Sequence, residues 1–326
     1  MRYVIRRAGF FVVTLWAALT LNFVIPRLMP GNPALAMLAK YPHLNPQALH
    51  ALEVAFGVND RQSLVSSYFS YFGNMATGNF GVSLSRYPDP VSTVVMQALP
   101  WTLTLVGVTT VLAFILGTLI GLLSAWRRGG WLDSWLPPIF VITSSFPYFW
   151  VGIVSIWLFG ITLHWLPESG NLSLSDTGGF SLHYLGDVLV HALLPAMTIL
   201  VTSIGGWILT MRNNMISVLA DDYVRMARAK GLRPWSVMWG YAGRNAILPN
   251  LTGFAMSLGF VVSGAILVED VFNYPGVGFM LLQAVEAEDY ALMQVLFLLI
   301  TLAVLLAILA ADILTAVLDP RTRDLA

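Results

Sequence analysis

Histidine and cysteine are the residue types that most often hold metals, and their pattern in this sequence predicts no metal site. The five histidines are His43, His50, His164, His183 and His191, and they lack the H-E-x-x-H spacing of a zinc site. They fall outside the long apolar stretches or at their boundaries, where we expect surface or interfacial positions. The 326-residue chain has no cysteine, which excludes disulfides, thiolate metal sites and cysteine nucleophiles. We therefore expect neither a metal nor a cofactor in this chain.

Groups for hydrolytic chemistry are also missing from the sequence. An intramembrane protease needs a serine nucleophile with a basic partner, or paired aspartates, inside its apolar segments, and neither arrangement occurs. The chain has no G-x-x-x-x-G-K-[ST] phosphate loop. Ionisable residues are nearly absent from the interiors of the apolar stretches, which argues against a transporter driven by protons or sodium. We expect no catalytic residue.

The segment from Arg212 to Pro249 has a spacing that suits recognition instead of catalysis. It reads RNNMISVLADDYVRMARAKGLRPWSVMWGYAGRNAILP and contains six basic residues. Asp221 or Asp222 is placed to cap a helix that Gly231 would close, and a second short helix is expected after Pro234. Such a segment is either a basic loop that touches anionic lipid or an exposed helical knob presented to a cytoplasmic protein. Its length and helical punctuation favour the knob.

The elements that must position this segment are membrane-spanning helices. Hydrophobic residues make up 57% of the chain and charged residues only 10%, whereas a soluble domain has about 25% charged residues. The mean hydropathy is +0.74, and the net charge of zero argues against a nucleic-acid partner. A helix needs about 20 apolar residues to cross the bilayer. Six such stretches are predicted to span it: one between Arg7 and Arg27, and others near 101–125, 135–158, 190–209, 251–267 and 292–311.

The basic residues orient these six stretches. With a cytoplasmic N-terminus, thirteen of the 17 lysines and arginines fall on the cytoplasmic side and four on the other, and this asymmetry sets topology. The cytoplasmic side then carries 13 basic and 6 acidic residues, net +7, and the outside 4 basic and 11 acidic residues, net −7. We expect an all-α integral membrane protein of six transmembrane helices with both termini in the cytoplasm.

Several motifs, taken in order and spacing, resemble those of a known family. They are MRYVIRR at the start, SFPYFWVG in the third stretch, DYVRMARAKGL followed by RNAILP, VEDVFNYPGVG after the fifth stretch, and LDPRTR near the end. The chain resembles the permease subunits of binding-protein-dependent ABC importers, and more narrowly the first of the two homologous membrane subunits of dipeptide and oligopeptide permeases. The wider importer pattern has Glu-Ala-Ala six residues before its glycine, whereas this chain has Arg225, Met226 and Ala227. That departure puts the polar contact in doubt and not the docking role.

The resemblance implies a fold, a location and a set of partners. The fold is that of a type I ABC importer permease in a bacterial or archaeal cytoplasmic (inner) membrane. Residues 1–100 would hold the first span and an extracytoplasmic segment, 101–312 the permease core with a coupling loop at 212–249, and 313–326 a cytoplasmic tail. The partners would be a second homologous permease subunit, two cytoplasmic ATPases that bind ATP and Mg, an extracytoplasmic substrate-binding protein and the lipid bilayer.

The resemblance also implies roles for particular residues. Those of the ATPase-coupling loop are Asp222, Tyr223, Arg225, Ala227, Ala229, Lys230, Gly231, Leu232, Arg244, Asn245 and Pro249. Those expected near the gate and the binding protein are Asp270, Phe272, Tyr274, Pro275, Gly276 and Gly278. Independently of the resemblance, the small residues Gly117, Gly121 and Gly253 are spaced for close helix packing. Pro137, Pro138, Pro147 and Pro195 could loosen their helices where a path bends, or form static kinks.

The sequence leaves alternatives for the role of one segment and for the transported substrate. The extracytoplasmic segment from Pro30 to Pro100, with a helix expected at PQALHALEVAF and an aromatic stretch SYFSYFGNMATG, is either a lid packed on the membrane surface or a docking surface for a soluble partner. The expected function is ATP-driven uptake of di- or oligopeptides by alternating access. The alternatives are the same importer type for oligosaccharides or nickel, and a standalone secondary transporter or channel.

Overall fold

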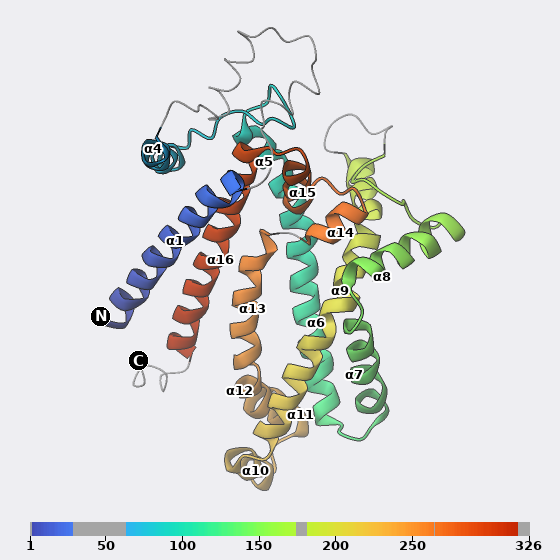
Figure 1. Ribbon diagram of the computed structural model, residues 1–326. Coiled ribbons are helices and arrows are strands. Elements are labelled where there is room, and N and C mark those ends of the chain that lie inside the picture. The colour runs from blue at the N-terminus through green and yellow to red at the C-terminus, as the bar shows by residue number, and fades with distance from the viewer. Residues whose placement is uncertain (1, 29–62, 174–180, 264, 319–326) are drawn as a thin grey trace.

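The computed structural model describes residues 2–28, 63–173, 181–263 and 265–318. Within these residues the secondary structure is helical, apart from one isolated bridge between Val82 and Pro90 (Figure 1). The helix expected at PQALHALEVAF and residues 319–326 of the expected tail lie outside the described residues.

In chain order, the α-helices of the described residues are α1 (Arg2–Leu28), α4 (Leu64–Thr77), α5 (Val91–Thr102), α6 (Val108–Trp126), α7 (Trp131–Ser144), α8 (Tyr148–Ser155) and α9 (Leu182–Leu219). They continue with α10 (Asp222–Ala229), α11 (Pro234–Ser236), α12 (Arg244–Ala246), α13 (Leu248–Val261), α14 (Ile266–Val271), α15 (Val277–Glu286) and α16 (Tyr290–Leu318). Three π-helical segments, η1 (Leu103–Gly107), η2 (Ile156–Thr162) and η3 (Val237–Gly243), continue neighbouring α-helices.

Four of the described helices are long and apolar enough to cross a membrane, and a bent pair formed by α7 and α8–η2 makes a fifth candidate. The expected fifth stretch corresponds to α13, which is only 14 residues long because the helix ends at Val261 and a turn follows at residues 262–263. The structure therefore describes an all-helical membrane protein with four or five candidate spans.

Two spans begin or end well beyond the hydropathy limits expected from the sequence. The second span starts at Val91 and runs through η1 to Trp126, so residue 101 lies inside it. Its added outer turns hold Val91, Val94 and Ala98, which pack on α15 and α16. The fourth span, α9, extends over 38 residues, about 57 Å at 1.5 Å per residue. The first part of the expected loop, Arg212–Leu219, is thus the end of α9.

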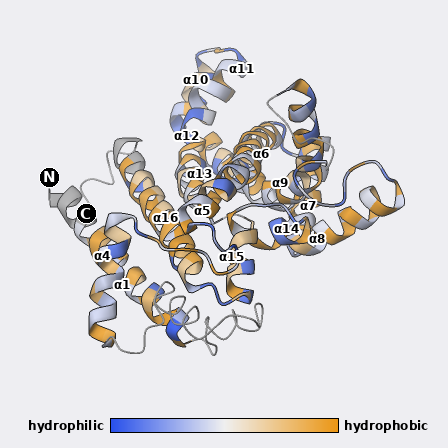
Figure 2. Cartoon of the chain, turned by 90° about the horizontal axis from the view of Figure 1, so that it is seen from above, coloured by the Kyte–Doolittle hydropathy of each residue, from blue (hydrophilic) through white to orange (hydrophobic). Residues whose placement is uncertain are grey.

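The third expected span is sharply bent. Its two halves meet at 97°, at the residues between Ser144 and Tyr148. Pro147 explains the break, because proline has no N–H to donate and disfavours a helical conformation in the residue before it. On the near side of the bend the Thr143 hydroxyl donates to the carbonyl of Val201 on α9, at 3.1 Å. As a result α8 projects sideways from the bundle (Figure 1), and Figure 2 shows apolar residues along it.

The centre of the bundle is the contact of α6 with α9, flanked by α7 and α13. A Cβ on Gly117 would lie 2.5 Å from the Cβ of Trp207, and one on Gly121 would lie 2.5 Å from the carbonyl oxygen of Ile208. Only glycine fits at this separation. A Cβ on Gly253 of α13 would meet the Trp207 ring at 3.4 Å, an ordinary contact. All three glycines expected to serve helix packing thus surround one stretch of α9.

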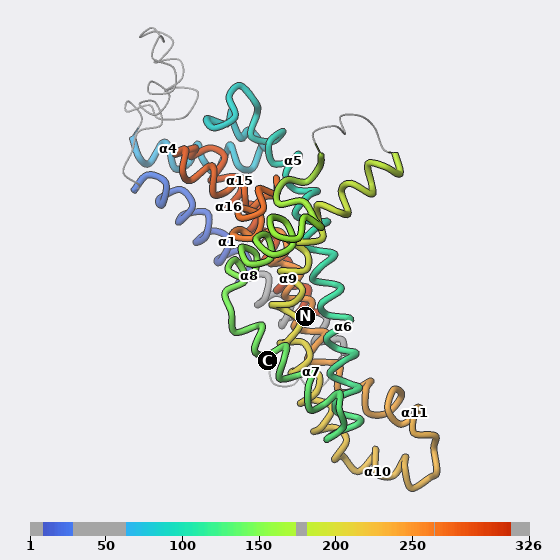
Figure 3. Tube along the Cα trace, turned by 90° about the vertical axis from the view of Figure 1, so that its right-hand side faces the viewer, coloured from blue at the N-terminus to red at the C-terminus, as the bar shows by residue number. Residues whose placement is uncertain are grey.

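The two ends of the bundle differ in their elements. The short helices α10–α12 form a knob at the lower end of Figure 1, the end to which the described termini of α1 and α16 also point. The helices α4, α14 and α15 lie at the upper end. Figure 3 shows the same separation from the side, with α10 and α11 far from α4 and α15.

Candidate functional site

The knob at the lower end is built by α10, α11, η3 and α12. The apolar residues of α10 that face the bundle are Val224 and Ala227, and they pack with Met211 and Met215 of α9. The guanidinium of Arg228 lies over the Trp126 ring at the end of α6, 5.3 Å from its centroid. The knob therefore rests on both central helices, α6 and α9.

Gly231 ends α10 as the sequence predicted. Its φ is +73°, in the left-handed region that favours glycine, and its N–H donates to the carbonyl of Arg228. The second helix begins at Pro234, also as predicted, although most of it is the π-helical segment η3. Asp221 occupies the position before α10, but its side chain makes no capping hydrogen bond.

The polar residues of α10 point into solvent. Asp222 and Arg225 form an exposed pair 3.7 Å apart, with side chains 97% and 69% exposed, so this pair contributes little to stability. Ala229, Lys230 and Leu232 are exposed as well. Ala227 was expected among the docking residues, but the structure turns it inward because its spacing from Val224 places both on the packed face.

A polar cavity of about 650 Å³ opens between the helices of the knob. It is lined by Tyr223, Gly240, Tyr241, Arg244, Asn245 and Leu248. The side-chain amide of Asn245 donates to the hydroxyl of Tyr223, at 2.7 Å, and so joins α12 to α10. Pro249 lies exposed in the first turn of α13. Three of the predicted loop residues, Tyr223, Arg244 and Asn245, thus share one cavity.

At the upper end, the carboxyl of Glu269 organises the segment between α14 and α15. Its side chain is completely buried. It accepts hydrogen bonds from the Thr102 hydroxyl at 2.8 Å and from the backbone N–H groups of Gly278 at 2.7 Å and Phe279 at 3.2 Å. The Thr102 oxygen in turn accepts from the N–H of Val277. Burial raises the pKa of the Glu269 carboxyl, while these hydrogen bonds act in the opposite direction.

The glycines of this segment make room for that carboxyl. A Cβ on Gly276 would lie 2.5 Å from the Glu269 carboxyl, and one on Gly278 would lie 2.7 Å from the Cα of Ile266. The aromatic rings of Phe272 and Tyr274 face the protein interior and are 2% and 1% exposed. They were expected near the gate and the binding protein; in the structure they pack with Leu105, Leu194 and Val268. Asp270 and Pro275 remain partly accessible.

A second buried carboxylate, Asp289, fixes the turn between α15 and α16. It accepts hydrogen bonds from the Ser83 hydroxyl, from the hydroxyl and N–H of Ser85, and from the N–H of Leu292. No local sequence pattern singles out Thr102, Glu269 and Asp289, because an acid in a segment that is expected to be extracytoplasmic is by default a solvated charge, and a threonine in an apolar stretch carries no signal of its own. Only the distant partners identify them as buried.

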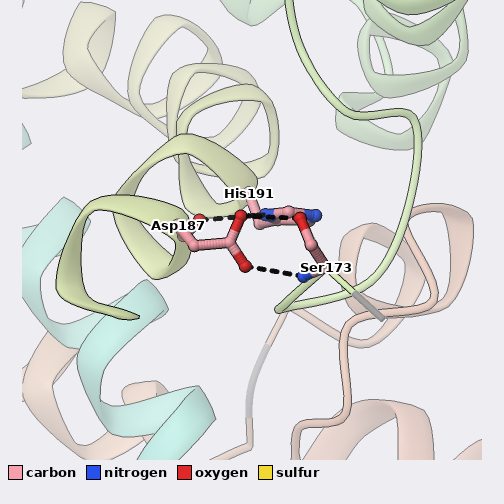
Figure 4. Close-up of polar contacts among 3 residues, drawn as sticks. All are labelled: Ser173, Asp187 and His191. Carbon is pink, nitrogen blue, oxygen red and sulfur yellow. Dashed lines mark hydrogen bonds and ion pairs between the residues drawn. The ribbon is translucent and has the colours of Figure 1, made fainter. Parts of the chain in front are cut away.

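A third polar contact holds the loop before α9 (Figure 4). The Asp187 carboxylate accepts from the hydroxyl of Ser173 at 2.7 Å and from its N–H at 2.6 Å. The Nδ1 atom of His191 lies 2.9 Å from the Asp187 backbone carbonyl and 3.3 Å from its carboxylate. Serine and histidine both contact the aspartate here, whereas in a hydrolytic triad the histidine lies between the serine and the aspartate. We therefore interpret Ser173, Asp187 and His191 as a structural contact and call it the latch.

The sequence profile that describes binding-protein-dependent transport system inner membrane components matches residues 117–324. This range includes the α6–α9 contact, the knob and the Glu269 segment. The chain belongs to this family. Members are the non-catalytic, multi-pass subunits of ABC importers in the inner membrane, so this permease works with an ATPase and a binding protein.

Full-length relatives have peptide-related names. The permease is 33% identical to the di/tripeptide transport system permease protein DppB of Pseudomonas aeruginosa, with 99% of both chains aligned. It is 33% identical to the oligopeptide transport system permease protein AppB of Bacillus subtilis, over 98% of both chains. It is 32% identical to the glutathione transport system permease protein GsiC of Escherichia coli, over 99% of both chains.

Proposed function

We propose that this permease takes up peptides, delivered by an extracytoplasmic binding protein, through alternating access driven by two ATPases. The names of the full-length relatives support peptides over oligosaccharides or nickel. Membership of a binding-protein-dependent family removes the support for a standalone secondary transporter or channel.

The proposed topology has six spans and cytoplasmic termini, with the predicted stretch near 251–267, which begins in α13, serving as the fifth span. The charge asymmetry of +7 against −7 supports it, and so does the common direction of the knob and of the described ends of α1 and α16 (Figure 1). A second homologous permease subunit would complete the path and would cover the apolar face of α8, which this chain leaves exposed.

The observation that carries the proposal is the exposed knob at the end of α6 and α9. We propose that an ATPase binds its outward residues, among them Tyr223, Arg225, Lys230 and Leu232, together with Trp235 and Trp239. Trp235 is 65% exposed and its ring lies 5.8 Å from that of Trp239. Such exposed aromatic side chains next to basic residues are typical of interface hot spots. At the opposite end, Asp270 and Pro275 would contact the binding protein.

Gly231 gives a direct test of coupling. We expect Gly231→Val to abolish peptide uptake by the reconstituted importer and the stimulation of ATP hydrolysis by the loaded binding protein. Binding of peptide to the binding protein itself should not change. A side chain at Gly231 meets no atom within 4 Å, so the variant acts through backbone strain of about 1–2 kcal/mol or more.

Gly129 provides a matched control. Its φ is +78° and its surroundings are equally open, but it lies in the loop between α6 and α7. We expect Gly129→Val to keep stimulated ATP hydrolysis while bearing the same backbone strain. Equal losses in both variants would contradict a special role for the knob. Uptake of labelled dipeptide that is competed by oligosaccharide or Ni²⁺, and not by peptide, would contradict the substrate.

A further inference from the structure

Helix α4 is fixed to the upper part of α1 by specific contacts. The Tyr68 hydroxyl lies 2.8 Å from that of Thr20, and the Asn22 amide donates to the Tyr71 hydroxyl at 3.0 Å. The Phe23 ring lies between them, with its centroid 5.3 Å from that of Tyr68 and 5.6 Å from that of Tyr71. These contacts define one packed face of α4.

The rest of the α4 surface divides into two sectors of opposite character. At about 100° per residue, Val65, Phe69 and Ala76 lie within about 40° of one another. All three are exposed, with Val65 at 66% and Phe69 at 68%. The exposed polar residues occupy the next sector, roughly 120° further round the helix. They are Ser66, Ser70, Asn74 and Thr77.

The direction of α4 suits a membrane surface. Figure 1 shows α4 end-on beside the upper part of α1, whereas the spans run lengthwise, and Figure 3 shows α4 lying across them. In Figure 3 the N-terminal end of α4 lies on the side from which Figure 1 is viewed. Because α4 is right-handed and runs away from the viewer of Figure 1, its successive residues turn clockwise in that view. With the packed face toward α1, the apolar sector faces sideways and down, and the polar sector faces up.

The part of α1 that α4 contacts also exposes apolar side chains. The outward residues on the same part of α1, Leu21 and Ile25, are 59% and 48% exposed on a helix that qualifies as a span. The sequence of α4, LVSSYFSYFGNMAT, contains no charged residue, so it has no charge to attract an acidic or basic protein. Water is a poor partner for such a sector, and the boundary of acyl chains and headgroups is a good one.

We propose that α4 is an interfacial helix of the outer leaflet. Val65, Phe69 and Ala76 face the acyl chains, and the polar sector faces headgroups and water. The lipid anchors α4, and α4 holds the upper part of α1 through Tyr68 and Tyr71. The leaflet assignment rests on the proposed topology, while the contact with lipid does not.

Spin labels on single cysteines test this in the complete importer, reconstituted in phosphatidylcholine liposomes. The chain has no native cysteine, so each label reports one position once partner cysteines are replaced. We expect labels at Val65→Cys, Phe69→Cys and Ala76→Cys to collide more with lipid-soluble oxygen than with a water-soluble nickel chelate. The matched neighbours Ser66→Cys, Ser70→Cys and Thr77→Cys should show the reverse order.

Three other results would overturn the proposal or its parts. Strong collision with the nickel chelate at Val65 and Phe69 would mean a water-exposed surface, free to dock a soluble protein. Weak collision with both reagents at Val65 and Phe69 would mean that the second permease subunit covers the apolar sector. If the collision pattern holds but a membrane-impermeant maleimide labels Ser70→Cys only after the membrane is opened, lipid contact stands and the proposed topology fails.

Discussion

Replacing Gly121 by alanine tests whether the α6–α9 contact requires the absence of a side chain. The added Cβ would lie 2.5 Å from the Ile208 carbonyl oxygen and 2.9 Å from the Met211 Cβ. Carbon atoms approach carbonyl oxygens to about 3.3 Å, so the two helices would have to separate by about 0.8 Å at this point. A gap of that size removes a quarter to a half of the attraction at neighbouring contacts.

The expected cost follows from this geometry and from helix propensity. Overfilling a packed site costs about 1–3 kcal/mol, and the alanine recovers up to about 1 kcal/mol because it favours the helix more than glycine does. Gly206→Ala on α9 is the matched control, since its Cβ meets no atom within 4 Å and it gains the propensity alone. We therefore expect Gly121→Ala to be less stable than Gly206→Ala by about 1–3 kcal/mol.

The measurement is the free energy of unfolding of the purified permease in mixed micelles, followed by tryptophan fluorescence as the denaturing detergent increases. Gly253→Ala provides a second control, in which the added Cβ makes an ordinary contact of 3.4 Å with the Trp207 ring. We expect its stability to stay close to that of Gly206→Ala. If Gly121→Ala and Gly206→Ala unfold at the same detergent fraction, the argument that glycine sets the α6–α9 distance is wrong.

Three more experiments test the polar contacts. Because burial raises the folded-state pKa of Glu269, the folded protein binds this proton more tightly, so wild-type stability should fall as pH rises above about 4.5 toward the raised pKa. Glu269→Gln should remove that part of the pH dependence in thermal unfolding, and identical pH profiles would refute the buried carboxyl. Asp289→Ala leaves four donors without their acceptor, and a buried donor that stays unsatisfied costs about 1–3 kcal/mol, so the unfolding midpoint should fall; it should fall less for Asp289→Asn. The Arg212 guanidinium of α9 donates two hydrogen bonds to the Asp133 carboxylate of α7. A double-mutant cycle of Asp133→Asn and Arg212→Gln should give a coupling free energy of about 1 kcal/mol, and additive effects would show that this ion pair does not stabilise the fold.

The sequence predicted features that depend on neighbouring residues. The helix end at Gly231 and the helix start at Pro234 follow from backbone preferences of glycine and proline, and both are confirmed. The apolar stretches predicted helices in the right order. Their limits were wrong at Val91 and Leu219, because hydropathy measures contact with lipid and stops where a helix leaves the bilayer.

Features that depend on distant partners could not be predicted. Pro147 indicated a weak point, but the 97° bend also depends on the contact of Thr143 with α9. Glu269 meets Thr102 at a separation of 167 residues, and no local pattern distinguishes this buried acid from a solvated one. The inward turn of Phe272 and Tyr274 follows from the same long-range packing.

The distribution of charge suggests how motion passes through the permease. At the lower end the basic residues of the knob are exposed, whereas at the upper end Glu269 and Asp289 are buried and bonded to several elements. One end is thus open to partners and the other is internally fixed. The helix α9 joins them, because it runs unbroken from the latch at Asp187 to the knob, despite Pro195. We therefore expect a displacement applied to the knob to pass along α9 and to move α6 with it, since at Gly121 the two helices are in close contact.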